Sequence, residues 1–292
     1  MRRRVSMSMC AAALAALAVL PACRRKAPEE PPVATPEVIF QHDRVAIGSP
    51  ARITYKFTVA QNAPELIKGV DYWVFSHVLD PTGEQLWTDD HAPVPPTSTW
   101  KPGQTVEYTR TVFVPNYPYI GEAVMRVGLY DRSSGRRLAL TGTEASRREY
   151  ITAKFQLLPQ SENIFLIYKD GWHPAEVAPD NAMLEWQWTK KTATISFRNP
   201  RKDCLFYLDW DARVDLFTPP QQVSVAVNGQ PIGTFPADSR DRKMLTFPIT
   251  AAQLGATDMA EIVLTVDKTF APGSGDPREL GIRVFHAFVE PK

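Results

Sequence analysis

Residues 51–59 read ARITYKFTV, a strict alternation of apolar and polar side chains. Ile53, Tyr55 and Phe57 fall on one face of an extended chain, and the polar residues between them fall on the other. A period of two residues is typical of a β-strand with one buried face. This stretch therefore predicts a strand of a sheet that covers a core.

The same short β-favouring runs recur outward from this strand through the whole chain. Strands are expected at 71–79, 106–114, 121–130, 148–157, 192–197, 204–212, 222–227, 243–249, 260–266 and 281–289. Turn residues separate the runs at 80–83 and 131–135, and Asn228-Gly229 is the strongest short-range hairpin signal. One helical turn is expected at 250–254, because Thr250 is a good N-cap and Gly255 a good C-cap.

This pattern predicts an all-β fold of two β-sandwich domains. Pro occurs 26 times among 292 residues, and Pro is tolerated in turns and at strand edges but not in helix interiors. Strands every 10 to 15 residues or so between 38 and 158 favour an immunoglobulin-like sandwich. The strand pattern breaks at 159–163, so the second sandwich is expected at 164–290.

The charge composition argues against a nucleic-acid partner. The chain contains 33 basic and 32 acidic residues, which gives a formal charge of +1. The basic residues show no strong clustering along the sequence, and a balanced chain has no general attraction for a phosphate backbone.

The first 22 residues have the features of a secretory signal peptide. Three arginines precede an apolar run at 9–20, which is shorter than the 20 or so residues of a membrane-spanning helix. The following LPAC at 20–23 resembles the lipobox of bacterial lipoproteins. The resemblance implies cleavage before Cys23 and lipidation of Cys23 with acyl chains such as palmitate. The alternative is ordinary cleavage after Ala22, with Cys23 incidental.

The lipobox resemblance implies a cellular location as well as a modification. A lipidated Cys23 would anchor the chain to a membrane at the outside of the cell, and 23–37, rich in Pro and charge, would form a tether. Arg24 stands where an Asp would signal inner-membrane retention, so an outer membrane is favoured in a Gram-negative host. Cys204 then has no disulfide partner in the mature chain and is expected to be a small buried side chain near a strand start.

Four spaced motifs lie in the second half of the chain: GWH at 171–173, WQWT at 186–189, VAVNGQPIGTF at 225–235 and DPRELGIRV at 276–284. Together they resemble an extracytoplasmic, carbohydrate-binding-like domain that is appended to bacterial membrane glycosyltransferases. The resemblance implies a jelly-roll-like β-sandwich and brings no catalytic residue. The sequence departs from those enzymes because it shows no multi-spanning membrane segment.

Three tryptophans are candidates for glycan binding. Trp186 and Trp188 share one strand face by the two-residue period, and Trp172 lies in a loop before a Pro. Sugar rings pack on exposed aromatic faces, so these residues could form a binding platform. The alternative is that all three belong to the core, where large aromatic residues are common.

Two acidic clusters could supply metal ligands: Asp209, Asp211 and Asp215, and Asp89-Asp90-His91. Asp209 and Asp211 alternate with apolar residues on a predicted strand, where they cannot wrap one ion, and Arg213 is their expected counter-charge. A second cluster, Asp89-Asp90-His91, has no further His or Cys nearby. The sequence therefore predicts no metal site and no cofactor.

The sequence contains none of the short motifs that mark common hydrolases, metalloproteases or nucleotide-binding enzymes. The predicted function is non-catalytic binding of a glycan or an envelope protein, beside a machinery for cell-surface polysaccharide synthesis or export. The alternative is a hydrolase of envelope polymers, because 32 acidic residues allow many carboxylate pairs. Catalytic residues are not predicted.

Overall fold

The structure is a computed structural model that describes residues 30–273 and 275–292. The predicted signal peptide, Cys23 and residues 24–29 of the predicted tether lie outside the described residues. Within the described ranges, no helix combines the length and the apolar character needed to cross a membrane. Strands dominate the chain, so the predicted all-β fold is confirmed.

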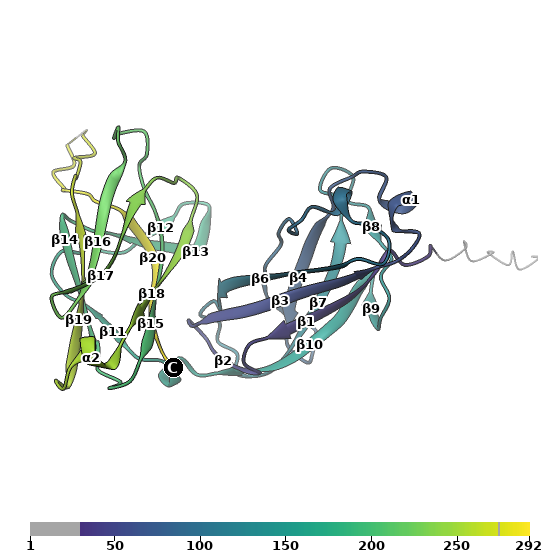
Figure 1. The fold of residues 1–292 in the computed structure, drawn as a ribbon, viewed down its shortest axis with the longest axis horizontal. Helices are drawn as coiled ribbons and strands as arrows, with labels where there is room; N and C mark the ends of the chain where they lie inside the picture. The colour runs from purple at the N-terminus through teal and green to yellow at the C-terminus, as the bar shows by residue number, and fades with distance from the viewer. Residues whose placement is uncertain (1–29, 274) are drawn as a thin grey trace, which may run out of the picture. The chain divides into compact units, whose positions relative to one another are not determined.

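The N-terminal sandwich contains two sheets that face each other (Figure 1). The first sheet has the order β1-β3-β6 and contains β1 (Ala34–Phe40), β3 (Pro50–Val59) and β6 (Thr105–Phe113). The second has the order β2-β10-β7-β4-β5, with β8 beside β7 and β9 beside β10. Its strands are β2 (Arg44–Ala46), β4 (Trp73–Leu79), β5 (Gln85–Thr88), β7 (Gly121–Tyr130), β8 (Arg137–Leu138), β9 (Glu144–Ser146) and β10 (Glu149–Leu158).

The chain crosses between these sheets after β1, β2, β3, β5 and β6, as in immunoglobulin-like sandwiches. Alternation along β3 builds the core: Ile53, Tyr55 and Phe57 are fully buried, whereas Arg52 and Thr58 are exposed. Short helical turns lie in the connections: α1 (Ala63–Ile67), η1 (Thr97–Thr99) and η2 (Gln160–Glu162).

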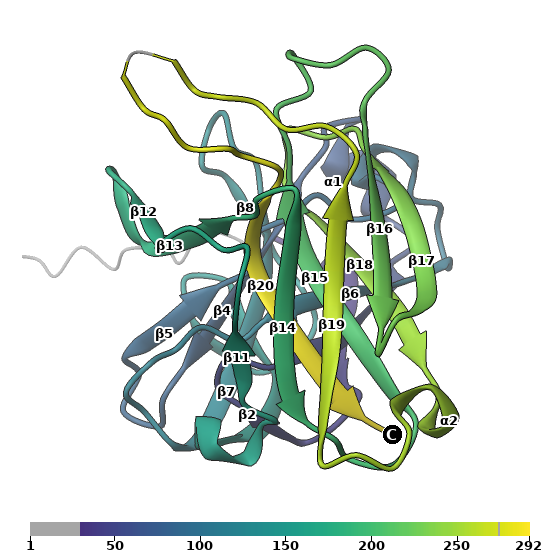
Figure 2. The same cartoon turned by 90° about the vertical axis from the view of Figure 1, so that its left-hand side faces the viewer.

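The C-terminal sandwich contains two five-stranded sheets. One has the order β11-β14-β19-β16-β17 and consists of β11 (Leu166–Tyr168), β14 (Thr192–Arg198), β16 (Gln221–Val227), β17 (Gln230–Ala237) and β19 (Met259–Val266). Figure 2 shows this sheet in front. The other has the order β12-β13-β20-β15-β18 and consists of β12 (Glu176–Ala178), β13 (Asn181–Trp188), β15 (Cys204–Asp211), β18 (Lys243–Ile249) and β20 (Arg283–Pro291).

The chain alternates between the two sheets from β14 to β16 and again from β17 to β20, which is a jelly-roll-like path. The predicted Asn-Gly hairpin joins β16 to β17, and Asn228 takes the positive φ of 47° that this turn requires. The predicted helical turn is α2 (Ala251–Leu254), which begins with a capping box between Thr250 and Gln253. Cys204 opens β15 and is fully buried, as expected.

Several strands were not predicted from the sequence. β2, β8, β9, β11 and β12 have only two or three residues each, which is too short to display a two-residue period. Each of them forms because it pairs with the free edge of a longer strand. The sequence alone does not show which edges are free.

Candidate functional site

The sheet that contains β15 carries charged and aromatic side chains on its outer face. Phe206, Leu208 and Trp210 point into the core, so Asp209 and Asp211 lie on the opposite face. Both carboxylates are nevertheless buried, with 3% and 2% of their surface exposed. We call this surface the aromatic–carboxylate face and define it by Trp186, Trp188, Asp209, Asp211, Arg242, Arg283, Phe285 and His286.

Asp211 is held by an arginine from the neighbouring strand. The pairing of β15 with β20 places Arg283 opposite Asp211, and the guanidinium donates two hydrogen bonds, Nε to Oδ1 at 2.6 Å and Nη2 to Oδ2 at 2.5 Å. The same guanidinium lies 5.0 Å from the ring centroid of Trp186 and 5.6 Å from that of Trp188. Burial raises the pKa of Asp211 above its ordinary value, although the bonds from Arg283 favour the ionised form.

Asp209 has two partners on the same face. A β-bulge beside Asp209 brings the His286 imidazole close, with Nδ1 at 3.0 Å from Oδ2, and Arg242 also donates to both carboxylate oxygens. Burial favours the neutral carboxyl, but the hydrogen bonds from His286 and Arg242 outweigh it and lower the pKa of Asp209. The side chains of His286 and Arg242 are 40% and 41% exposed, so both are partly accessible to solvent.

The expected counter-charge of this face was wrong. Arg213 does not pair with Asp209 or Asp211; it forms a bidentate pair with Asp215, two residues along the same loop. β15 ends at Asp211, so Arg213 already lies beyond the strand and no longer follows its alternation. The two carboxylates are buried under Arg242 and Arg283, which the sequence places 30 or more positions away.

Trp172, the loop candidate for glycan binding, packs against the core of the C-terminal sandwich. Its indole N–H donates to the backbone carbonyl of Thr194 at 2.8 Å, and the edge of its ring meets Tyr168 at 4.8 Å between centroids. The side chain is half-buried, and the Trp172 backbone forms a β-bridge with Thr189, the residue after Trp188.

The other two candidates lie together on the aromatic–carboxylate face. Trp186 is half-buried and its indole N–H donates to Glu176 at 3.2 Å. Trp188 is 8% exposed, and its ring contacts Phe270 edge-on at 5.6 Å. The structure thus brings Trp186 and Trp188 to one face beside Arg283, whereas the Trp172 ring packs on the core.

This arrangement suits a saccharide ring chemically. Trp186 and Phe285 supply partly accessible aromatic surface, on which the C–H groups of a sugar can pack. Arg242 and His286 supply hydrogen-bonding groups for hydroxyls, and Asp209 fixes both in place. A surface whose polar groups are already oriented loses less entropy when it binds.

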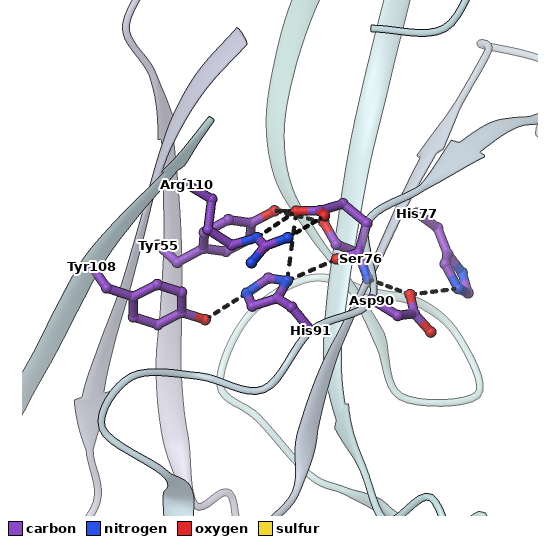
Figure 3. Close-up of polar contacts among 8 residues, drawn as sticks. Tyr55, Ser76, His77, Asp90, His91, Tyr108 and Arg110 are labelled. Carbon is purple, nitrogen blue, oxygen red and sulfur yellow. Dashed lines mark hydrogen bonds and ion pairs between the residues drawn. The ribbon is translucent and has the colours of Figure 1, made fainter. Parts of the chain in front are cut away.

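A second polar cluster lies between the two sheets of the N-terminal sandwich, and Figure 3 shows its side chains converging from both sheets. We call it the inter-sheet cluster and define it by Tyr55, Ser76, Asp89, His91, Tyr108 and Arg110. Arg110 of β6 donates to both oxygens of Asp89, at 2.9 and 2.7 Å. The Tyr55 hydroxyl lies 3.0 Å from the Ser76 hydroxyl and 3.3 Å from Asp89 Oδ2.

His91 completes the inter-sheet cluster. Its Nδ1 lies 2.7 Å from the backbone carbonyl of Asp89, and a carbonyl can only accept, so Nδ1 carries the proton. Nε2 then accepts the Tyr108 hydroxyl at 2.8 Å. Burial and the nearby Arg110 charge lower the pKa of His91, so the imidazole is held neutral.

The inter-sheet cluster contains the residue types of a catalytic relay, but its geometry is structural. Ser76 is fully buried and its hydroxyl is bonded to Tyr55. Burial raises the phenol pKa of Tyr55 and of Tyr108, which is the opposite of activation as a nucleophile. Within the described residues, no group of three or more metal-ligating side chains gathers here or elsewhere.

Sequence reasoning identified Asp89 and His91 as a loop cluster but missed their partners. Tyr55 and Tyr108 are a directly opposed pair on β3 and β6, and this register alone puts their hydroxyls beside the loop. The alternation of β6 also placed Arg110 on the inward side of the strand. An inward arginine on a predicted strand is the signal that would have found the cluster.

No protein-family model matches the chain, and no curated protein matches it. Among solved structures, the M60 catalytic domain with two CBM51 domains of Clostridium perfringens ZmpB is 10% identical at a TM-score of 0.24, over 82% of this chain and 34% of that one. A glycoside hydrolase family 43 arabinoxylan arabinofuranohydrolase from Bacillus subtilis is 10% identical at a TM-score of 0.28, over 88% of this chain and 41% of that one.

An exo-β-1,3-galactanase from Phanerochaete chrysosporium is 12% identical at a TM-score of 0.29, over 87% of this chain and 56% of that one. The chain thus spans from about a third to just over half of the length of these three structures. Similarities this low assign neither a family nor an activity.

Proposed function

We propose that this protein is a lipid-anchored protein of the bacterial cell envelope whose C-terminal sandwich binds a glycan without cleaving it, as an accessory to cell-surface polysaccharide synthesis or export. The binding surface is the aromatic–carboxylate face. The anchor is Cys23, proposed from the lipobox resemblance of residues 20–23.

One observation carries the glycan proposal: two buried carboxylates on an outward sheet face orient arginines against aromatic rings. A carboxylate taken from water is costly unless it is paired and hydrogen-bonded. Asp209 and Asp211 meet this condition only through side chains of the same face. The result is a rigid layer of planar groups, with Trp186 and Arg242 at its partly exposed surface.

A hydrolase is the second candidate, because the pKa of Asp209 is lowered while that of Asp211 is raised. Opposite shifts on neighbouring carboxyl groups are the pattern of an acid–base pair. However, both oxygens of Asp211 accept bonds from Arg283, which leaves the carboxyl poorly placed to give a proton to a leaving group. The geometry therefore supports binding better than hydrolysis.

Glycan-array and calorimetric binding with the mature chain carrying Cys23→Ser test the proposal. We expect Trp186→Ala and Arg242→Ala each to weaken binding of the retained glycan about tenfold or more, since each removes one contact group. Phe165→Ala is the matched control, because Phe165 is a 79% exposed aromatic residue outside the face.

Equal loss in Phe165→Ala and Trp186→Ala would contradict the assignment of the face. Turnover of released envelope glycan that stops in Asp211→Asn would instead favour the hydrolase. If neither glycan binding nor turnover is observed, the remaining hypothesis is that the two sandwiches bind a protein partner.

The anchor is tested separately. A fatty-acid probe should label the full chain expressed in a bacterium, and Cys23→Ser should abolish the label while Cys204→Ser retains it. Labelling that persists in Cys23→Ser would remove the anchor from the proposal.

A further inference from the structure

Two neighbouring turns of the N-terminal sandwich gather arginines from residues 132–148. The β7–β8 turn contributes Arg132 and Arg136, the start of β8 contributes Arg137, and the β9–β10 turn contributes Arg147 and Arg148. The turns touch, since the Arg137 guanidinium donates to the Arg147 carbonyl at 2.9 Å and Arg148 donates to the Arg137 carbonyl. We call these five residues the arginine-rich end. The five arginines are close in sequence, and the contact between the two turns brings them to one end of the sandwich.

Acidic side chains of this region form hydrogen bonds or ion pairs inside the region. Asp131 accepts from the serines of its own turn, and Glu149 lies between Arg126 and Arg137. Within the described residues, neither Arg132 nor Arg147 has a carboxylate within ion-pair distance, and both are exposed. Arg132 and Arg147 therefore present positive charge to solvent at the arginine-rich end.

The β9–β10 turn keeps two arginines at a conformational cost. Ser146 pairs with Glu149, so Arg147 and Arg148 are the two central residues of a tight hairpin. Their φ angles are 45° and 63°, and such a turn favours Asn and Gly. Strain at a surface turn suggests that the side chains are kept for a function other than folding.

The arginine-rich end lies where the tether enters the folded domain. The Val33 N–H donates to the carbonyl of Ala139 at 2.8 Å, and the Thr141 N–H donates to that of Ala34 at 2.9 Å. Figure 1 shows β8, β9 and the start of β1 at the same end of the sandwich. The chain from Cys23 to Val33 can reach at most about 36 Å.

An amphipathic aromatic residue lies at the same end. Trp73 pairs with Tyr130, the last residue of β7, and the Arg132 guanidinium lies 4.2 Å from the Trp73 ring centroid. The Trp73 ring is half-buried. Trp and Tyr beside arginines are typical of surfaces that meet the headgroup region of a bilayer.

We propose that the arginine-rich end binds the anionic headgroups of the membrane to which the chain is anchored. One lipid anchor combined with basic residues holds a protein at a membrane more firmly than either signal alone. This inference goes beyond the glycan proposal. The identity of the membrane rests on the anchor proposal, but the test does not require a lipid on Cys23.

The test measures binding of the mature chain carrying Cys23→Ser to vesicles of phosphatidylglycerol and phosphatidylcholine, by sedimentation. We expect salt-sensitive binding that pure phosphatidylcholine vesicles do not support. Each lost positive charge should weaken binding about fivefold, so Arg132→Gln/Arg136→Gln/Arg147→Asn should weaken it about 100-fold. Because Asn accepts a positive φ, Arg147→Asn alone should also keep or raise the melting temperature while it weakens binding.

The matched control removes three positive charges elsewhere in the same sandwich: Arg44→Gln/Arg52→Gln/Lys154→Gln. Arg44 lies on β2, which pairs with the opposite end of β10, and Lys154 lies in the middle of β10. Equal weakening in the control, or no weakening in the triple variant, would overturn the proposal. Tighter binding to a soluble anionic polysaccharide than to the vesicles would assign the surface to that polymer and would also overturn it.

Discussion

Two largely buried carboxylates of this protein are each paired with an arginine. Asp89 is 11% exposed at its side chain and Asp211 3%, and each is matched by a bidentate arginine on a facing or neighbouring strand. Bidentate pairs are the strongest common form of charge-assisted hydrogen bond. Removal of either partner therefore costs more than the pair itself contributes.

Arg110→Leu should destabilise the protein by about 2 kcal/mol. It leaves the Asp89 carboxylate without its main partner, but Arg110 is 35% exposed at its side chain, so water can partly replace it. The expected loss is thus below the 3 to 5 kcal/mol or so of a fully buried pair. Urea unfolding gives the free energy of unfolding of each variant.

The double variant Arg110→Leu/Asp89→Leu is the matched comparison. It removes the orphaned carboxylate together with its partner, so it should be less destabilised than Arg110→Leu alone. A double variant that loses as much as both single variants combined would show that the two side chains act independently.

Strands with a clear two-residue period could be predicted from the sequence, because burial of one face imposes that period. β7 and β18 begin and end where their alternation does. The two-residue period of Trp186 and Trp188 predicted a strand face, and β13 contains both residues, but the sequence did not indicate where this strand begins. The pairing of β13 with β20 at Trp188 and Arg283 depends on contacts between distant segments.

The β16–β17 hairpin is the element with the most specific sequence signal. Asn228 takes a positive φ, and its side chain accepts from the Glu261 N–H at 2.9 Å and donates to the Leu254 carbonyl at 2.9 Å. One residue therefore joins the hairpin to β19 and to α2.

Replacement of Asn228 separates the effect of its positive φ from that of its side-chain hydrogen bonds. Asn228→Gly keeps the backbone freedom but loses the hydrogen bonds, so it should cost about 2 kcal/mol. Asn228→Ala loses both and should cost about 3 kcal/mol. Thermal unfolding of the two variants checks the order, and an alanine variant as stable as the glycine variant would contradict the argument.

Across the whole molecule, the composition predicted the fold class but not where charge gathers. The described chain has one core in each sandwich, and both follow from alternating apolar residues. The aromatic–carboxylate face depends on a β-bulge that brings His286 and Arg283 beside two aspartates from another strand. Register and bulges are set by the packing of whole sheets, so no local stretch of sequence reveals them.

The stability of the chain should fall as the pH drops below about 6.5, because His91 sits neutral inside the inter-sheet cluster. Its pKa in the folded chain is lowered by burial and by Arg110, from an ordinary value of 6.5. The unfolded chain therefore takes up a proton at a higher pH than the folded chain does. Acid then favours unfolding between 6.5 and the lower pKa of the folded chain.

His91→Gln cannot take up that proton, so its stability should change less over the same pH range than that of the natural chain. The charged and titratable groups that face His91 are Asp89, Asp90, Arg110, Tyr108 and Tyr55, and none of them is replaced in this variant. Urea unfolding at a series of pH values from neutral to mildly acidic measures both slopes. The exposed His42, replaced in His42→Gln, controls for loss of an imidazole. Equal slopes for the natural chain and His91→Gln would show that the inter-sheet cluster does not couple folding to pH.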